Sequence, residues 1–97
     1  MNPARIEAAL QEHPGVTAAA VAGVADPVTG EAAAALVVAA PGCAPGCDEL
    51  RSFCAERLPH YMVPRFVRFV EDLPRNPAGK LLRDRVAQML RREPSTV

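Results

Sequence analysis

Residues 16–24 (VTAAAVAGV) and 32–39 (AAAALVVA) decide the fold of this chain, because they flank a segment of turn-forming residues at 26–30 (DPVTG). Alanine favours helix, so composition alone would predict two helices here. Length argues against them, because each run has fewer than ten residues, lies between glycines or prolines, and contains valines. The pattern therefore predicts a β-hairpin.

The segment before the hairpin carries the signals of a short helix. Asn2 can cap its first turn, and Pro3 suits the first helical position. The apolar stripe of this helix consists of Ile6, Ala9 and Leu10. Residues 13–15 (HPG) end it.

A second helix is predicted after a loop at residues 41–46. Asp48 and Glu49 place negative charge at the positive end of the helix dipole, and Pro59 ends the helix. Its apolar residues recur at helical spacing: Leu50, Phe53, Cys54 and Leu58.

Residues 65–70 (RFVRFV) predict a third strand. Its pattern leaves Arg68 on a face shared with Phe66 and Val70, which suits a strand at the edge of a sheet. A loop at residues 71–79 leads to a last helix that Pro94 closes. The apolar face of that helix consists of Leu82, Val86, Met89 and Leu90.

The predicted order is α-β-β-α-β-α, an α/β (α+β) fold in which helices flank a small three-stranded sheet. A chain of 97 residues is one domain, which we assign to residues 1–93, with a disordered tail at 94–97. No apolar run approaches the roughly 20 residues that span a membrane. The N-terminus lacks the pattern of a signal peptide, so we expect a cytoplasmic location.

The net charge of the chain is zero, but the charges are unevenly distributed. Residues 1–58 hold three basic and seven acidic side chains, for a net charge of −4, whereas residues 59–97 hold eight and four, for +4. A basic half fits either an anionic partner or a solvated helix face. Aromatic residues make up only 4% and no nucleic-acid-binding motif is present, so no nucleic-acid partner is expected.

Three cysteines are an odd number for a disulfide framework, and none is predicted. Cys43 and Cys47 resemble half of a zinc site, but His13 and His60 lack the paired spacing of further ligands. We therefore expect no metal. Cys54 lies on an apolar helical stripe and is predicted to be a small core residue.

Residues 73–83 (LPRNPAGKLLR) are the stretch that indicates chemistry. Pro74 and Pro77 restrict this loop, and Gly79 can adopt a positive φ. Lys80 is predicted at the entry to the last helix, where a cation is mildly unfavourable against the helix dipole. It is either an ordinary surface charge or a functional group. A phosphate-binding P-loop is excluded, because the second glycine and the Ser/Thr after the lysine are missing.

This stretch resembles the last signature of the adenylate-forming superfamily, which includes acyl-CoA synthetases, peptide-synthetase adenylation domains and luciferases. The signature is Leu-Pro, a short variable loop, Gly-Lys, and a basic residue three positions on. Residues 2–7 (NPARIE) resemble the helix opening after the family's hinge, and residues 13–16 (HPGV) and 26–31 (DPVTGE) its hairpin. Residues 61–64 (YMVP) resemble the family's Tyr-Lys-Val-Pro, with Met62 replacing a common lysine. The similarity covers about residues 2–90.

The resemblance implies that the chain is the small C-terminal lid domain of such an enzyme. Lys80 matches the lysine that enters the active site of a larger N-terminal domain, where a carboxylate attacks the α-phosphate of ATP and pyrophosphate leaves. The small domain then rotates, and the thiol of coenzyme A or of a carrier's pantetheine attacks. Arg83 matches a basic position that supports the helix start, while Pro74 and Gly79 shape the loop.

The resemblance also implies that ATP with Mg, and coenzyme A, bind mainly to the N-terminal domain, which this chain lacks. The chain alone is therefore expected to be inactive. Leu82 stands where peptide-synthetase domains usually have aspartate, which favours an acyl-CoA synthetase. The spacing of Pro74, Gly79 and Lys80 is that of acyl-CoA synthetases silenced by acetylation of this lysine, so acetylation of Lys80 is predicted.

Two alternatives stay open. The chain fits the small domain of a peptide-synthetase adenylation domain. It also fits a free-standing, non-catalytic binding module that docks on an acyl carrier protein or on a separate large subunit. The acid and the thiol acceptor are not specified by these residues.

Overall fold

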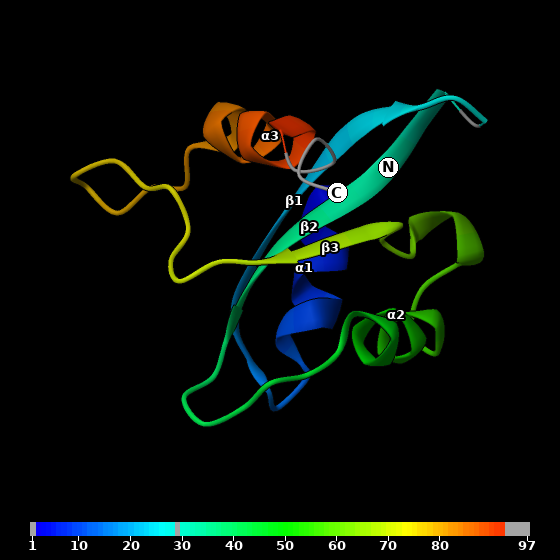
Figure 1. Cartoon of the computed structure of the whole chain (residues 1–97), viewed down its shortest axis with the longest axis horizontal. Helices are drawn as coiled ribbons and strands as arrows, with labels where there is room; N and C mark the ends of the chain where they lie inside the picture. The colour runs from blue at the N-terminus through cyan, green and yellow to red at the C-terminus, as the bar shows by residue number, and fades with distance from the viewer. Residues whose placement is uncertain (1, 29, 93–97) are drawn as a thin grey trace.

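The predicted hairpin forms the centre of the computed structural model, which describes residues 2–28 and 30–92 (Figure 1). β1 (Val16–Asp26) and β2 (Gly30–Ala39) pair antiparallel, with Asp26 opposite Gly30 at the turn. The strands therefore extend two residues further into the predicted turn than the sequence indicated. Gly30 has a φ of +89°, a conformation that glycine adopts without steric cost, so the turn needs few residues.

The third strand lies at an edge of the sheet, as predicted. β3 (Phe66–Phe69) pairs parallel with β2, and the strand order is β1-β2-β3. A parallel neighbour requires a crossover connection, and the segment that contains α2 (Cys47–Ala55) and the 3-10 helix η1 (His60–Met62) supplies it. The strand is shorter than the predicted 65–70, although the N–H groups of Arg65 and Val70 still donate to β2.

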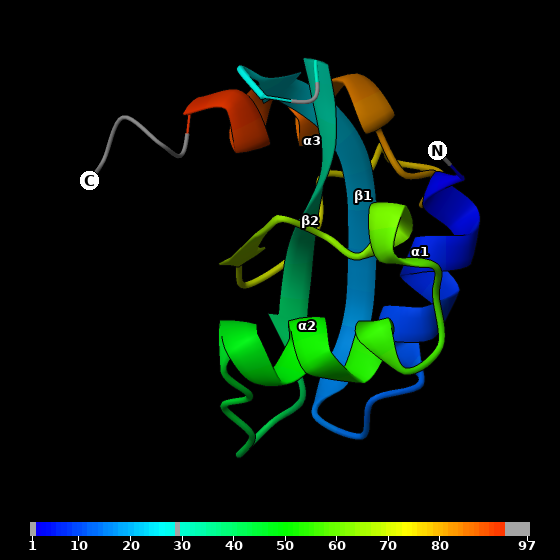
Figure 2. The same ribbon diagram turned by 90° about the vertical axis from the view of Figure 1, so that its right-hand side faces the viewer.

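The helices cover both faces of the sheet. α1 (Pro3–Gln11) and α2 lie on one face, and α3 (Arg83–Arg92) lies on the other (Figures 1 and 2). The first core includes Ile6, Leu10, Val21, Val37, Leu50, Cys54 and Met62, and the second includes Ala20, Leu36, Leu73, Val86 and Leu90. The predicted order α-β-β-α-β-α is confirmed, with η1 as an addition.

Burial on both faces explains the alanine-rich hairpin. In β2, Ala33, Ala35 and Val37 belong to the first core, while Ala34 and Leu36 belong to the second. A strand covered on both sides reads as a nearly continuous apolar run rather than an alternating one. Small side chains at these positions let a helix approach the sheet closely from each side. The alanines that favour helix locally therefore serve a sheet.

The predicted end of the second helix is wrong. α2 ends at Ala55, four residues before Pro59, because the N–H groups of Arg57 and Leu58 both donate to the carbonyl of Cys54 and form a tight turn. Leu58 is still buried, and Cys54 is a core residue as predicted. Burial raises the pKa of the Cys54 thiol, which disfavours its ionised form.

The family-like Tyr-Met-Val-Pro segment begins within η1. Met62, which stands where a lysine is common, has only 3% of its surface exposed and belongs to the first core, so its apolar character suits its place. In residues 2–28 and 30–92, no helix has the length and apolarity needed to cross a membrane. Pro94 and the predicted tail at 94–97 lie outside the described residues.

Candidate functional site

The loop that carries Lys80 joins β3 to α3 and projects away from the helices and the sheet (Figure 1). Leu73 is buried in the second core and anchors the start of the loop. The residues that follow are half-buried or exposed. The loop therefore has an anchored base and a tip that no core residue supports.

Two strands of a miniature hairpin form the neck of this loop. The N–H of Leu82 donates to the carbonyl of Pro74 at 2.9 Å, and Arg75 pairs with Leu81 in an isolated antiparallel bridge. The ring of Pro74 fixes its φ, and its carbonyl is the acceptor of the hydrogen bond from Leu82. The predicted role of Pro74 in shaping the loop is consistent with this geometry.

The tip is a turn closed by Asn76. The N–H of Gly79 donates to the carbonyl of Asn76 at 2.8 Å, and the N–H of Asn76 donates to the carbonyl of Lys80 at 2.9 Å. The side-chain Oδ1 of Asn76 accepts from the N–H of Lys80 at 2.9 Å. Gly79 has a φ of +89°, which confirms the positive φ that the sequence indicated.

Lys80 lies in this hairpin and not at a helix start. α3 begins at Arg83, three residues later, because the Lys80 carbonyl accepts from the N–H of Asn76 and Leu81 pairs with Arg75, which holds this segment in the hairpin. The prediction that Lys80 opens the last helix is therefore wrong, and so is the end of the predicted loop at residue 79. The residue is exposed, and none of the described residues forms a hydrogen bond or ion pair with its Nζ.

Lys80 is also the only lysine in the sequence, which otherwise uses ten arginines for its positive charges. Lysine places a compact, mobile charge on a flexible stem, whereas arginine presents a rigid fork that suits fixed ion pairs. Several of the arginines make such fixed contacts in this structure: Arg51, Arg57, Arg65, Arg75 and Arg83. The single lysine therefore occupies the one loop that presents a cation without a partner among the described residues.

Arg83 fixes the base of α3 to the rest of the domain. Its Nη1 and Nη2 donate to Oε2 and Oε1 of Glu7 at 2.7 and 3.1 Å, and Nη1 also approaches the carbonyl of Val21 at 3.4 Å. The hydrogen bonds to Glu7 raise the pKa of Arg83. The side chain thus joins α3 to α1 and β1, which agrees with the structural role predicted for it.

Glu7 is the residue that the sequence analysis missed. Its carboxylate is nearly buried, accepts from the N–H of Val21 at 2.8 Å, and receives both nitrogens of Arg83. The signal was available, because Glu7 lies next to Ile6 and three residues before Leu10 on the buried side of α1. A charged residue in that position indicates a buried partner.

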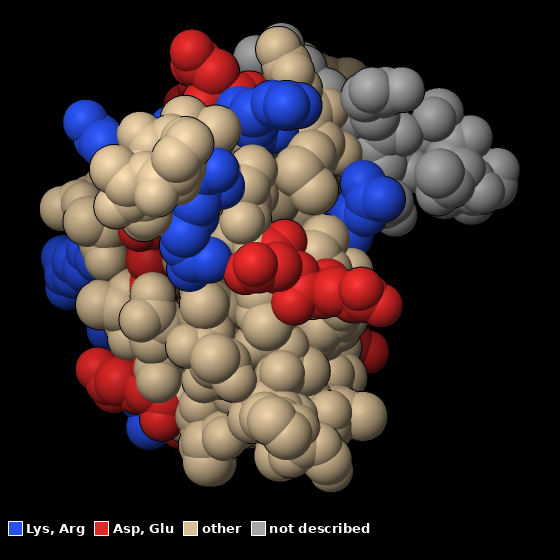
Figure 3. All heavy atoms as spheres, turned by 90° about the vertical axis from the view of Figure 1, so that its left-hand side faces the viewer, with Lys and Arg blue, Asp and Glu red and all other residues tan. Residues whose placement is uncertain are grey.

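A hollow of about 490 Å³ lies beside the loop, between its C-terminal strand and the first turn of α3. Its lining includes three basic residues and one acidic one: Lys80, Arg83, Arg85 and Asp84. Figure 3 views the face toward which the loop projects, where basic side chains in the upper half are interspersed with acidic ones and the lower middle is uncharged. In the lining of the hollow itself the basic side chains outnumber the acidic one, a balance that suits an anionic group.

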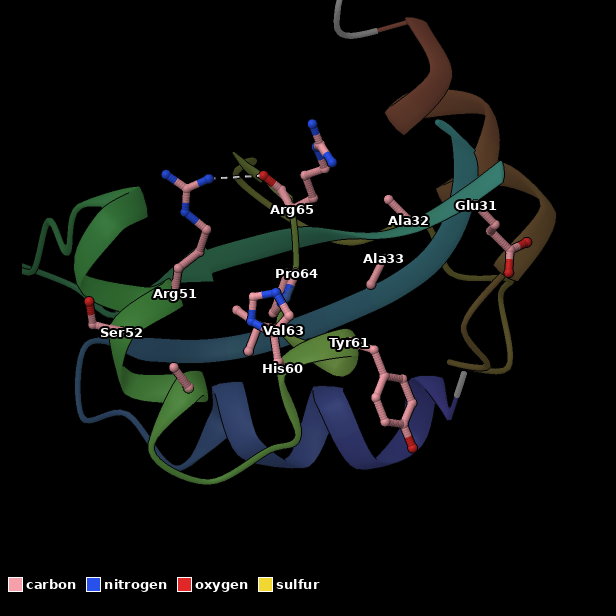
Figure 4. Close-up of a pocket in the computed structure, with 11 residues that line it drawn as sticks. Glu31, Ala32, Ala33, Arg51, Ser52, His60, Tyr61, Val63, Pro64 and Arg65 are labelled. Atoms are coloured by element: carbon pink, nitrogen blue, oxygen red, sulfur yellow. Dashed lines mark hydrogen bonds between the residues drawn. The ribbon is translucent and has the colours of Figure 1, made fainter. Parts of the chain in front are cut away.

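A second groove, of about 580 Å³, lies on another side of the molecule, between α2, η1 and the start of β2 (Figure 4). Arg51 of α2 donates to the carbonyl of Arg65 at 3.0 Å across one end, while Glu31 and Tyr61 lie toward the other. Both arginines already have carboxylate partners, Asp48 and Asp26 respectively. The positive charge at this groove is therefore partly neutralised.

The described part of the chain contains no group of three His, Cys, Asp or Glu side chains that could hold a metal ion. His13 has a structural role, because its Nδ1 accepts from the N–H of Gly15 at 2.9 Å and its Nε2 therefore donates to Glu49 at 2.7 Å. Its ring also contacts Phe53 edge-on at 4.9 Å.

Comparison with known families agrees with this geometry. The model of the AMP-binding enzyme C-terminal domain matches residues 5–80 and ends at Lys80. The chain belongs to this family. The matched segment runs from Arg5 in α1 to Lys80 and includes the turn that presents this lysine.

Curated relatives of this AMP-binding C-terminal domain are ligases. A medium/long-chain-fatty-acid–CoA/3-oxocholest-4-en-26-oate–CoA ligase of Mycobacterium tuberculosis is 49% identical over 78 residues, which are 80% of this chain and 14% of that protein. A 2-succinylbenzoate–CoA ligase of Geobacillus kaustophilus is 43% identical over 88 residues, or 91% and 18%. A fatty acid–acyl-carrier-protein ligase, ScoC of Streptomyces coeruleorubidus, is 44% identical over 81 residues, or 84% and 16%.

Solved structures contain the same domain. An amide bond synthetase, McbA of Marinactinospora thermotolerans, superposes with a TM-score of 0.84 at 46% identity and covers 88% of this chain and 17% of that one. An acyl-CoA synthetase of Brucella canis gives 0.86 at 36% identity, covering 92% and 17%. The chain thus spans about one sixth of the length of the proteins it resembles.

Proposed function

We propose that this chain is the mobile C-terminal domain of an ATP-dependent, AMP-forming acid–thiol ligase, in which Lys80 acts in the first half-reaction. The observation that carries the proposal is the presentation of Lys80: a single lysine, exposed at the tip of a hydrogen-bonded turn, at the last position matched by the family model. The names of the curated relatives support an acid–thiol ligase.

In the first half-reaction, a carboxylate oxygen of the acid attacks the α-phosphorus of ATP, supplied as the Mg complex, and the bond to pyrophosphate breaks. The products are an acyl-adenylate and pyrophosphate. Lys80 lies between the carboxylate and the phosphate or ribose oxygens while negative charge moves toward the leaving group. A pair of unit charges at 4 Å is worth about 4 kcal/mol at an effective dielectric near 20. An interaction of that size made only in the transition state accelerates the reaction roughly a thousandfold.

In the second half-reaction, a thiol loses its proton, its sulfur attacks the acyl carbon, and AMP leaves. The domain rotates between the two steps, so that Lys80 withdraws and another face meets the adenylate. The groove beside α2 lies on a different side of the domain from the Lys80 loop and is available for that second contact. The relation to ScoC supports a carrier's pantetheine as an acceptor besides coenzyme A.

A fusion enzyme tests the role of Lys80. The chain replaces the matching C-terminal segment of the Geobacillus 2-succinylbenzoate–CoA ligase, and adenylation is measured as pyrophosphate exchange into ATP that depends on 2-succinylbenzoate. Lys80→Ala should lower this rate about a thousandfold. Thioester formation from presynthesised acyl-adenylate should fall by no more than about twofold, since Lys80 has then withdrawn.

Arg5→Ala is the matched control, because it removes one exposed positive charge outside the loop and should leave both half-reactions unchanged. A Lys80→Ala fusion that adenylates at the wild-type rate would contradict the proposal. So would a wild-type fusion no more active than the Geobacillus N-terminal part alone.

We further propose that acetylation of Lys80 switches this ligase off. The Nζ is exposed, and acetylation would remove the charge on which the first half-reaction depends. Incubation with an acetyl donor and a lysine acetyltransferase should add one acetyl group to the side chain of the only lysine and abolish pyrophosphate exchange in the fusion. The absence of a mass gain on Lys80 would count against this regulation.

A further inference from the structure

We propose that Asn76 is a positioning residue that sets the direction in which Lys80 leaves the loop. The inference rests on the proposed function of Lys80. Asn76 contacts the backbone of Lys80 twice: its N–H donates to the Lys80 carbonyl, and its side-chain Oδ1 accepts from the Lys80 N–H, both at 2.9 Å. The peptide groups on both sides of the Lys80 Cα are therefore tied to one residue across the turn.

Packing does not hold the tip of this loop. Pro77, Ala78, Gly79 and Lys80 are all exposed, and Asn76 itself is only half-buried. The core contacts nearest to these four residues are those of Leu73, which is buried, and of Leu81, which is half-buried and packs against the second core. Hydrogen bonds therefore fix the tip, and the Oδ1 of Asn76 is the acceptor among them that belongs to a side chain.

The local sequence suits this arrangement. Asparagine is favoured at the first position of a type I turn, proline at the second and glycine at the fourth, and residues 76–79 read Asn-Pro-Ala-Gly. The bond from Gly79 to the carbonyl of Asn76 closes the turn regardless of the side chain at 76. Replacement of Asn76 therefore removes one bond to Lys80 and keeps the turn.

The proposed role of Lys80 requires that its Cα–Cβ bond point in a fixed direction, while the rest of the side chain stays mobile. Among the described residues the Nζ of Lys80 has no hydrogen-bond or ion-pair partner, so its reach is set by the orientation of the Lys80 Cα–Cβ bond. When a lysine must enter a site in another domain, the reaction is slower if its side chain can leave the backbone in many directions. Asn76 narrows that spread before the two domains meet.

The first test reads the Lys80 amide directly. Because Lys80 is the only lysine, chain labelled with ¹⁵N-lysine gives a single backbone amide signal, whose hydrogen exchange can be followed alone. Asn76→Ala should speed this exchange about fivefold, as expected for one net hydrogen bond. Asn76→Asp, which keeps an acceptor oxygen, should restore the rate to within about twofold.

The matched control is Asn2→Ala, because Asn2 begins the same tripeptide, Asn-Pro-Ala, and also accepts a backbone N–H, that of Arg5. It should leave the Lys80 exchange rate unchanged. Thermal unfolding of each variant shows that the chain is folded, and Asn76→Ala should unfold close to the wild-type temperature because its site is at the tip of a loop.

The second test uses the same fusion enzyme as the Lys80 variants. Asn76→Ala should lower kcat for adenylation about fivefold and leave the KM for ATP within about twofold, since the N-terminal part binds the nucleotide. Asn76→Asp should recover most of the lost kcat.

Three outcomes would overturn the inference. If Asn76→Ala changes neither the exchange rate nor kcat while Lys80→Ala is inactive, Asn76 does not position Lys80 and the proposed function stands. If Asn76→Ala speeds the exchange but leaves kcat unchanged, the bond is structural only. If Lys80→Ala keeps full activity, the proposed function fails and the role of Asn76 fails with it.

Discussion

The tripeptide Asn-Pro-Ala occurs twice in this chain, at residues 2–4 and 76–78, and the two copies fold differently. In the first copy, the N–H of Arg5 donates to the Oδ1 of Asn2 at 3.3 Å, and that of Ile6 donates to the Asn2 carbonyl at 3.2 Å. This is a capped helix start.

In the second copy the same two acceptors exchange donors. The carbonyl of Asn76 now accepts from the residue three positions on, Gly79, and Oδ1 accepts from the residue four positions on, Lys80. Gly79 has a φ of +89°, which ends any helical path, whereas its counterpart Arg5 continues a helix. The same capping residue therefore begins a helix in one copy and a turn in the other, and the residues that follow it decide which structure forms.

The largest expected effect comes from the core that holds the first copy in a helix. Ile6 is fully buried, so Ile6→Ala should lower the free energy of unfolding by about 3 kcal/mol, whereas Ile6→Val should cost about 1 kcal/mol. Chemical denaturation followed by circular dichroism measures both. A loss below about 1 kcal/mol for Ile6→Ala would mean that capping alone, rather than burial, maintains the helix. Val28→Ala, at a residue that is 79% exposed, is the control and should change stability by less than about 0.5 kcal/mol.

The next largest effect concerns the ion pair between Glu7 of α1 and Arg83 of α3. Glu7→Gln keeps an acceptor for Val21 but removes the charge that faces Arg83, and should cost about 2 kcal/mol. The cost is below that of breaking a fully buried pair, because the Arg83 side chain is 51% exposed. Denaturation at several pH values measures it.

The pH dependence from the arginine side has a defined sign. Pairing raises the pKa of Arg83, so the stability it contributes is present below its unfolded value and is lost only as the pH rises through the folded value. Both values lie far above neutrality. Between about pH 6 and 9, Arg83 stays protonated and should add no pH dependence to the difference between Glu7→Gln and wild type. A difference that shrinks steadily over that range would contradict the assignment.

A smaller effect is expected at Gly79, the glycine that follows the second copy, and it can be compared with that at Gly42 in another loop. At Gly79 a Cβ would meet no atom within 4 Å, so Gly79→Ala should cost about 1–2 kcal/mol through its positive φ alone. It should also lower adenylation in the fusion enzyme, because Lys80 is the next residue. Gly42 has a φ of +77° and equally open surroundings, so Gly42→Ala should match the stability loss and leave adenylation unchanged. Equal activities of the two variants would show that the direction of Lys80 does not matter.

The smallest effect is expected from a substitution, Arg5→Gly, that makes the sequence around the first copy resemble that around the second. Arg5→Gly places glycine after Asn-Pro-Ala, yet Ile6 and Leu10 are buried and should keep the segment helical. We expect a loss of about 0.5 kcal/mol, the cost of glycine in a helix. Amide chemical shifts of residues 3–11 report whether the helix persists. Conversion of this segment to a turn would show that local sequence outweighs core burial.

Much of the fold could be predicted because its signals are local. The hairpin, the helix after Asn2, the edge position of the third strand and the burial of Cys54 follow from residue spacing and turn residues, and the structure confirms them. The predicted helix ends were less accurate where hydrogen bonds of a neighbouring turn or loop replace those of the helix. α2 ends at Ala55 because Arg57 and Leu58 share the Cys54 carbonyl in a tight turn, and α3 begins at Arg83 because the Lys80 carbonyl is engaged within the loop.

The candidate site divides in the same way. Residues 73–83 by themselves indicated the restricting prolines and the positive φ of Gly79, since proline and glycine constrain the backbone wherever they occur. They left Lys80 as either a surface charge or a functional group, and the resemblance to the family supplied its predicted role. The position of Glu7 on the buried side of α1 was a local signal, but its partner Arg83 lies 76 residues away along the chain, and no local pattern connects two such positions.

The sequence by itself therefore determined the elements, their order and the loop that carries the lysine, because these depend on contacts between residues near each other in the chain. The tertiary structure alone shows that a buried carboxylate holds the start of α3 and that helices cover the alanine-rich strands on both faces. Each of these depends on groups brought together from distant parts of the chain, where burial between two layers of helices outweighs the local preference of the residues.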